Sequence, residues 1–431
     1  MQESTIYRRR EQLGRITDGL GLGEAYGATI ERIKDQGGGK SRLGMEALMW
    51  ISHAERPLRA DELCYALAIE LGSTNPNADN IPSTSTLVSC CQGLITMDKK
   101  ASTLRLIHFT LKEYLSTLPD IFSRPHSVMA EICLTHLNFS RLKALSADPP
   151  PHIPDTPFLG YCSLYWGAHA KKELSADSLS LAQTLLQGYD THISAKSLLE
   201  QVMHIIREDM GTNFRFSGIH CASFFGIVEI LVALIEKGSS DIDKGDCWGY
   251  TPLAWAAKNG HDGVVGVLLG HEEVNPNRTD NWGQTPLLHA AYEGHEAVVE
   301  ILLERDEVDP NQPERWGKTP LLHAAYKGNA EVAKALLRRR EVSPDKPNDA
   351  GRTPLSHAAQ SGHAGLVQML LELEEVNSER PDNCGRTPLW YAAGGGCEKV
   401  AKILLGREEV NPDTGFRIVR PVKSWRRDRA G

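Results

Sequence analysis

The chain has 431 residues, of which 41% are hydrophobic and 24% charged, and its formal net charge is −8. This composition is typical of a soluble folded protein with room for several domains, and the acidic balance argues against general affinity for nucleic acid. Nine cysteines without a C-x-x-C pair, no apolar run long enough to span a membrane and no apolar core in the first residues predict free thiols, a cytoplasmic location, no membrane contact and no secretory signal.

Near the amino terminus, IKDQGGGKSRLG (33–44) contains the end of a phosphate-binding P-loop motif, Gly39-Lys40-Ser41. A complete motif would have glycine where this sequence has Lys34, and it would follow a buried strand. The preceding stretch, GATIERIK, is polar and helix-like. We therefore interpret the segment as a solvated glycine turn.

The next stretch alternates helical and strand-like patterns. Apolar residues at helical spacing predict three helices, two short strands follow around Lys99 and Lys100, and TLKEYL then predicts a helix with Thr110 and Glu113 as its capping box. The three helices are expected at 42–56, 60–71 and 83–94. This order is that of a winged helix, but its third helix has no Arg or Lys, which disfavours DNA binding.

Residues 126–206 contain four further helical patterns, and the proline-rich segment 147–157 separates the first from the rest. Tyr165 and Trp166 are expected in the core. We find no catalytic constellation in this region.

An internal repeat dominates the carboxyl-terminal half. T-P-L recurs five times at a spacing of 34 residues, and Ser217 occupies the threonine position of an earlier, degenerate copy; the five threonines are Thr251, Thr285, Thr319, Thr353 and Thr387. Six units spanning 214–414 are therefore expected. Two short helices cannot bury their apolar faces alone but can do so when stacked, so the pattern predicts a solenoid.

One unit illustrates the local chemistry. Thr285 is expected to cap a first helix that begins at Pro286 and ends at Gly294. HEAVVEILLER (295–305) follows as a second, amphipathic helix with Val298, Val299, Ile301, Leu302 and Leu303 on its buried side.

These units resemble ankyrin repeats, with one departure from the usual T-P-L-H order. Leu288 occupies the position of the family's histidine, and His289 comes one residue later. The family's threonine–histidine hydrogen bond is therefore not transferred to His289, His323 or His357. We expect these three to be packed interior histidines rather than metal ligands.

The region before the repeats has a second resemblance. ALMWISHAERPLRADELCYAL and LRLIHFTLKEYL are similar to the winged-helix module that follows the nucleotide-binding domain in fungal NACHT–ankyrin proteins, signal-transducing ATPases related to heterokaryon-incompatibility and innate-immunity receptors. Residues 5–34 resemble the end of the NACHT region itself. The resemblance implies that the family's P-loop lies upstream of Met1, and that this chain lacks the ATPase core as a truncated product or an incomplete gene model.

In related receptors, the histidine of an H-x-S/T-x-x-E-Y stretch contacts the phosphate of the bound nucleotide. His108, Thr110, Glu113 and Tyr114 match that pattern. The resemblance implies a nucleotide-sensing role for His108 only where a NACHT domain is present. For this chain alone we interpret His108 as a polar residue at the end of a strand.

Repeat geometry also predicts where a partner binds. The hairpin tips and the outer ends of the first helices line the concave face of ankyrin proteins, and here aromatic residues gather at these positions in the middle units: Trp248, Trp282, Trp316, Tyr292 and Tyr326. Trp and Tyr dominate binding hot spots. The alternative is that each tryptophan packs on the next hairpin and stiffens the array.

The sequence thus predicts a mainly α protein that is not an enzyme: a winged-helix and helical module followed by an ankyrin solenoid with short β-hairpin turns. The expected parts are a NACHT remnant (1–41), a winged helix (42–125), a helical linker (126–213), six repeats (214–414) and a basic disordered tail (415–431). We expect a protein partner and no cofactor, catalytic residue, metal, small-molecule substrate or nucleic acid. Two alternatives remain open: the carboxyl half of a full-length NTPase, and a winged-helix DNA-binding regulator.

Overall fold

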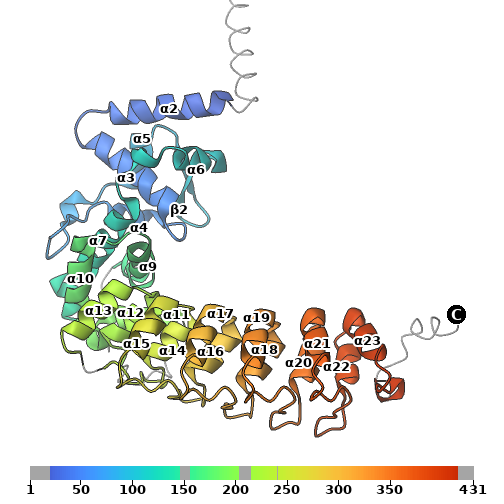
Figure 1. Ribbon diagram of the computed structural model, residues 1–431. Coiled ribbons are helices and arrows are strands. Elements are labelled where there is room, and N and C mark those ends of the chain that lie inside the picture. The colour runs from blue at the N-terminus through green and yellow to red at the C-terminus, as the bar shows by residue number, and fades with distance from the viewer. Residues whose placement is uncertain (1–19, 146–155, 203–214, 240, 416–431) are drawn as a thin grey trace, which may run out of the picture. The chain divides into compact units, whose positions relative to one another are not determined.

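A computed structural model describes residues 20–145, 156–202, 215–239 and 241–415 (Figure 1). The chain divides into two compact units, Met1–Phe214 and Arg215–Gly431, which are treated separately below. The expectations for residues 1–19, for most of the proline-rich segment and for the basic tail from 416 lie outside the described residues.

The glycine-rich segment forms a turn between two helices. Helix α2 (Leu20–Lys34) precedes it and helix α3 (Gly39–His53) begins within it, after Gly38 at a φ of 65°. Since a helix rather than a buried strand leads into the turn, and Lys40 is exposed, the geometry is not that of a P-loop, in agreement with the expected glycine turn.

The winged-helix topology is confirmed. After α3 come α4 (Ala60–Ala66), η1 (Ala78–Asn80), α5 (Thr84–Cys90), β1 (Ile95–Asp98), β2 (Thr103–Leu106) and α6 (Phe109–Ser116). The two strands pair antiparallel, with Ile95 opposite Leu106. Helix α4 ends at Ala66, five residues before the expected end at 71, and the buried residues Leu67, Ala68 and Ile69 follow it outside the helix.

The predicted capping box of α6 is wrong. The helix begins at Phe109, and His108, in an extended conformation, is its N-cap and accepts a hydrogen bond from the backbone N–H of Thr110. The hydroxyl of Thr110 instead lies 2.9 Å from the Tyr26 hydroxyl on α2. The tertiary contact with α2 therefore uses the side chain that the local sequence pattern assigned to the cap.

The helices expected after residue 125 are present. Helix α7 packs against α9 and α10, and Trp166 on α9 is fully buried, whereas Tyr165 is only half-buried. The elements are η2 (Pro119–Ile121), α7 (Pro125–Leu137), α8 (Ser140–Lys143), α9 (Leu159–Lys172), α10 (Ala176–Leu186), η3 (Tyr189–Thr191) and α11 (Ile193–Val202).

The second compact unit contains six helix pairs within its described residues, as predicted. We number these repeats one to six; they are α12 (Gly218–Phe225) with α13 (Val228–Glu236), α14 (Pro252–Lys258) with α15 (Asp262–Leu269), α16 (Pro286–Glu293) with α17 (Glu296–Leu303), α18 (Pro320–Lys327) with α19 (Ala330–Leu337), α20 (Pro354–Ser361) with α21 (Ala364–Leu371), and α22 (Pro388–Gly394) with α23 (Glu398–Leu405), before η4 (Pro412–Gly415). First helices pack on first helices and second on second along the row (Figure 1).

The local signals within a repeat act as the sequence predicts. Thr285 accepts a hydrogen bond from the backbone N–H of Leu288, Pro286 is the first helical residue, and Gly294 ends the helix at a φ of 90°. A Cβ at Gly294 would lie only 2.9 Å from the Asn329 side chain of the next repeat, so the glycine also permits close stacking. Of the residues expected on the buried side of α17, Ile301 is only half-buried.

The connections between repeats are tight turns, and no strand is assigned within residues 241–415. In the turn before α16, the backbone N–H of Asp280 donates to the carbonyl of Gln284. The expected β-hairpins are thus shortened to single hydrogen-bonded turns. Among the described helices, none has the length and apolarity to cross a membrane.

Candidate protein-interaction surface

The five aromatic residues predicted to bind a partner differ in exposure. Trp316 is 55% exposed and Tyr326 46%, and both belong to repeat four. Trp248, Trp282 and Tyr292 are half-buried. The accessible aromatic surface of the repeats is therefore concentrated on repeat four.

The turn tips are joined to one another by their backbones. The carbonyl of each tip residue accepts a hydrogen bond from the backbone of the next turn, at 2.8 to 3.3 Å: Trp248 from Asn281, Trp282 from Arg315, Trp316 from Asp349 and Ala350 from Asn383. The link is kept where alanine replaces tryptophan, and no ring contact among the described residues joins two of the three tryptophans. The backbone link therefore does not depend on the indole side chains.

The two tyrosines lie across the boundary between repeats. Tyr292 packs edge-on against His323 of the next repeat, with ring centroids 5.4 Å apart, and Tyr326 packs likewise against His357 at 6.0 Å. The Lys327 ammonium lies 4.0 Å from the centre of the Tyr292 ring. Each tyrosine therefore contacts the next repeat. Tyr326 is the more exposed of the two and is the more accessible to a partner.

A row of buried polar pairs lies beneath these aromatics. In three repeats, the side chain four residues after the capping threonine is hydrogen-bonded to an acidic residue five positions before that threonine. The pairs are Trp255 with Asp246 at 3.0 Å, His289 with Asp280 at 3.0 Å, and Tyr391 with Asp382 at 2.6 Å. The other oxygen of each carboxylate accepts two backbone N–H groups of the turn. Each acid therefore ties the turn to the first helix.

Burial is the largest influence on the pKa of Asp246 in this row. It raises the pKa of Asp246 to about 6, against the opposing effect of the Trp255 hydrogen bond. In repeat four the corresponding distance is longer, since Nε2 of His323 lies 3.4 Å from the carboxylate of Glu314. The histidines that the sequence analysis assigned to the interior are indeed buried at His289, His323 and His357.

Repeat five departs from the row. Its acidic position is occupied by Asn348, whose side-chain oxygen accepts the turn N–H groups of Ala350 and Arg352. His357 is 4% exposed, and neither of its ring nitrogens has a hydrogen-bond partner among the described residues. Burial, together with smaller effects of Arg352 and Lys318, lowers the pKa of His357 to about 3.

Cations follow the same periodicity in the last three repeats. Lys318, Arg352 and Arg386 each directly precede a capping threonine. Lys318 lies 3.8 Å from Glu314 and Arg386 lies 2.8 Å from Asp382, but no ion pair among the described residues includes Arg352. The Arg352 guanidinium lies 4.2 Å from the centre of the Tyr391 ring.

His108, the residue proposed to sense a nucleotide in a longer parent, lies in the first compact unit. It is exposed, and its Nδ1 lies 2.8 Å from the Thr110 hydroxyl. Tyr114 of the same motif packs against Tyr26, with ring centroids 5.7 Å apart. The motif residues are thus held by α2, while Phe109 beside His108 is 68% exposed.

A histidine cluster that the sequence analysis missed joins distant segments of the first unit. Nδ1 of His126 lies 2.8 Å from Nδ1 of His169, whose Nε2 lies 2.9 Å from the Tyr161 hydroxyl. Glu55 completes a group of three possible metal ligands within 4.8 Å of one another. However, the Lys172 ammonium lies 2.5 Å from the Glu55 carboxylate, and both nitrogens of His169 already have partners, so the cluster works as a hydrogen-bonded network that extends from the buried His169 to the surface.

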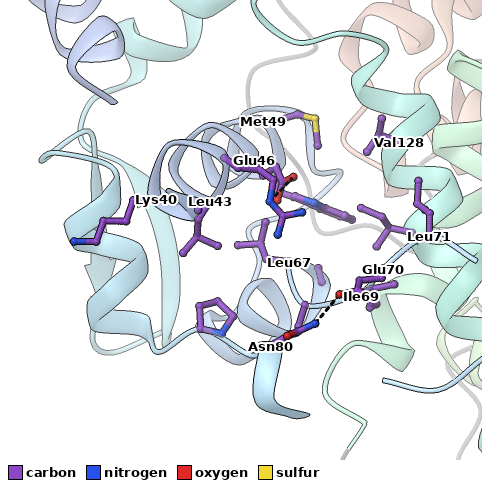
Figure 2. A pocket seen from close by; sticks show the side chains of 17 residues that line it. Lys40, Leu43, Glu46, Met49, Leu67, Ile69, Glu70, Leu71, Asn80 and Val128 are labelled. Atoms are coloured by element: carbon purple, nitrogen blue, oxygen red, sulfur yellow. Dashed lines mark hydrogen bonds and ion pairs between the residues drawn. The ribbon is translucent and has the colours of Figure 1, made fainter. Parts of the chain in front are cut away.

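A hollow of about 670 Å³ lies beside α3 in the same unit (Figure 2). Leu67, Ile69 and Leu71 form an apolar side, while Lys40 extends at its far end. The Asn80 amide donates to Glu70 across its rim at 2.8 Å. Apolar and charged side chains share its lining, since Arg42 and Glu46 lie 3.9 Å apart within it, and the turn before Lys40 does not have the geometry of a P-loop.

Comparison with protein families agrees with the two folds. Three copies of the ankyrin-repeat family model match residues 175–280, 267–348 and 340–414, which together span more than half of the chain. The chain therefore belongs to the ankyrin-repeat proteins. Residues 31–127 match the winged helix domain of GPI inositol-deacylase. No curated protein matches the chain.

These comparisons refine the second resemblance. A winged helix is present, and the family that matches it is named for a deacylase rather than for NACHT ATPases. The match covers a winged helix alone and no catalytic domain. The ankyrin match identifies a protein-interaction module.

The sequence analysis placed the aromatics but not the polar row beneath them. The signal was available, because an acid or asparagine recurs at the same 34-residue spacing as the threonines: Asp246, Asp280, Glu314, Asn348 and Asp382. The spacing alone does not show which of these residues form a side-chain hydrogen bond with the first helix.

Proposed function

We propose that the chain is a non-enzymatic recognition module, and that the tips and first-helix ends of repeats two to four bind a protein partner. The contact residues are Trp248, Trp282, Trp316, Tyr292 and Tyr326. The observation that carries the proposal is the exposure of Trp316 and Tyr326 on one repeat, since large aromatic side chains left in water mark interaction sites.

The wider context of this module is also proposed. A winged helix (42–125) and a helical linker (126–213) before six repeats (214–414) suit the recognition part of a NACHT-type signalling protein in the cytoplasm. The resemblance of residues 5–34 and of the His108 motif to that class supports this context. The exposed Phe109 beside His108 fits a winged helix that contacts a further domain in a longer parent, which is the alternative of a full-length NTPase.

The test of the recognition surface is Trp282→Ala combined with Trp316→Ala in the full chain. We expect circular dichroism and melting temperature to remain close to wild type, because the turn tips are joined through their backbones. We expect the double variant to lose most of the proteins that immobilised wild type enriches from a cell lysate, measured by quantitative mass spectrometry.

Gln368→Ala is the matched control, since this exposed side chain lies on the second helix α21 rather than at a turn tip. It should capture the same proteins as wild type. If instead the double variant melts much earlier than wild type, the tryptophans are structural. If it is stable and still enriches the same proteins, the aromatic surface is not the binding site.

A further inference from the structure

Repeat five lacks the acid that repeats two, three, four and six have at the equivalent position of the turn. In repeats two, three and six a buried carboxylate ties the turn to the first helix, whereas repeat five has Asn348 in this position. Two groups that a carboxylate would satisfy are left there: the Nε of Arg352, and the His357 ring, which like the His323 ring of repeat four has no hydrogen-bond partner at either nitrogen among the described residues. Repeat five is therefore short of one negative charge.

The surroundings of Arg352 are cationic. Lys318 of repeat four and Arg386 of repeat six occupy the equivalent positions on either side. Both are close enough to act electrostatically in repeat five, because Arg386 disfavours the charge on Arg352 and Lys318 disfavours a charge on His357. Their own carboxylates, Glu314 and Asp382, are buried beneath them.

The nearest acids do not neutralise Arg352. Asp382 already binds Arg386 and Tyr391. The carboxylate of Asp349 lies against the backbone of the preceding turn at Gly317. Asp382 favours the charge on Arg352 from a distance, but the side-chain contacts of Arg352 are the amide oxygen of Gln360 and the face of Tyr391. Among the described residues this guanidinium therefore has no ion-pair partner.

Apolar surface adjoins this cation. Tyr326 covers His357 of repeat five with its ring edge-on and remains 46% exposed, and Trp316 in the preceding turn is 55% exposed. Two exposed aromatic side chains in the same repeat as a cation of this row favour a ligand with two features: a carboxylate for the guanidinium and an apolar side chain for the rings. An extended acidic peptide with apolar residues between its carboxylates meets both.

We propose that repeats four to six bind an acidic segment of a partner protein, with one carboxylate on Arg352 in place of the acid that repeat five lacks, and a neighbouring apolar side chain on Trp316 and Tyr326. The inference rests on the proposed recognition function and names its ligand. The chain as a whole carries a net charge of −8, so this cationic row gives the surface a local charge opposite to that of the molecule.

The first step of the test is a selection of random displayed peptides on the full-length chain. We expect the selected peptides to contain Asp or Glu next to an apolar residue. Binding of one selected peptide, and of its Glu→Gln or Asp→Asn version, is then measured by fluorescence anisotropy. Loss of the charge should weaken binding to wild type at least about tenfold, as expected for one charge-assisted contact.

Two variants test the placement. Arg352→Gln should weaken the acidic peptide at least about tenfold and bring the affinities for the acidic and neutral peptides together. Asn348→Asp restores the missing acid within the repeat, so it should also weaken the acidic peptide while leaving the melting temperature equal to or above that of wild type. Arg338→Gln changes an exposed arginine directly after α19; it is the control and should leave binding unchanged.

Failure of this inference and failure of the proposed function give different results. Peptides without acidic residues that lose binding on Trp282→Ala with Trp316→Ala, but not on Arg352→Gln, would keep the recognition surface and overturn the acidic ligand. No difference between the tryptophan variant and wild type for any peptide would overturn the recognition surface itself. A DNA duplex that binds as tightly as the peptide and is weakened equally by Arg352→Gln would make this a general polyanion site, contrary to the proposal.

Discussion

The position of one histidine side chain determines which residue it hydrogen-bonds in the turn or cap of its repeat. In repeat one, which keeps histidine at the family's usual position, His220 lies 2.8 Å from the Ser217 hydroxyl and 2.9 Å from the carbonyl of Lys244. In repeat three the histidine comes one residue later and reaches Asp280 instead. The shift of one position exchanges a bond to the capping residue for a bond to the acid of the turn.

His289 has a buried carboxylate as its partner, whereas His357 has no hydrogen-bond partner among the described residues. The same substitution is therefore expected to have different effects on stability at these two positions. His289→Leu leaves the buried Asp280 carboxylate without its side-chain partner and should lower the free energy of unfolding by about 2–4 kcal/mol. His357→Leu removes a ring whose nitrogens have no partner, and should change stability by less than about 1 kcal/mol or increase it. Urea unfolding at pH 7.5 measures both.

The two positions are otherwise well matched, since each histidine is buried on the first helix of its repeat. Equal losses of stability in the two variants would show that the ring's packing, rather than the bond to Asp280, stabilises the repeat.

At the scale of the elements, small residues allow the first helices to approach. Ala324 and Ala325 on α18 are fully buried, and α18 packs against both α16 and α20. Each repeat buries its apolar face mainly against its neighbours, so the stability of one repeat depends on the next.

Ala324→Glu places a charge at this contact. We expect it to cost several kcal/mol, roughly 3–5, because a buried carboxylate without a partner is strongly unfavourable. Hydrogen exchange should then show loss of protection in repeats three to five. Gln368→Glu adds the same charge at an exposed position of α21 and serves as the control; a melting temperature of the Ala324 variant within a degree of this control would refute the burial.

At the scale of the whole molecule, buried neutral histidines make stability depend on pH. Burial lowers the pKa values of eight described histidines, most strongly in five of them: to about 3 for His136, His169 and His357, and to about 4 for His192 and His220. The unfolded chain binds protons at these sites below about pH 6.5, while the folded chain does not. Stability is therefore full above that pH and is lost as the pH falls.

We expect the melting temperature to fall between pH 7 and pH 5, with each such histidine contributing up to about 1.4 kcal/mol per pH unit below 6.5. Asp246, Glu46 and Asp345 act in the opposite direction, since burial raises the pKa values of these acids and the folded state takes up a proton first, but they are three groups against eight. Differential scanning calorimetry measures the fall. His357→Leu should reduce it, and a melting temperature that does not change with pH would contradict the assignment.

The sequence by itself determined most of the array. Five threonine–proline pairs at equal spacing specify helix starts, and glycines specify helix ends, because capping and turn conformation depend on a few adjacent residues. The winged-helix order followed in the same way from helical and strand periodicity. These features are local, so they can be read without knowing what packs against them.

Only the tertiary structure decided how the side chains are used. Thr110 was assigned to a helix cap by its neighbours, yet it contacts Tyr26 on a helix more than eighty residues earlier. The histidine pair at 126 and 169 and the missing acid of repeat five likewise depend on contacts between separate segments. Such partners are chosen by burial and distance in three dimensions, because a buried polar group takes whichever partner the packing brings within hydrogen-bond reach.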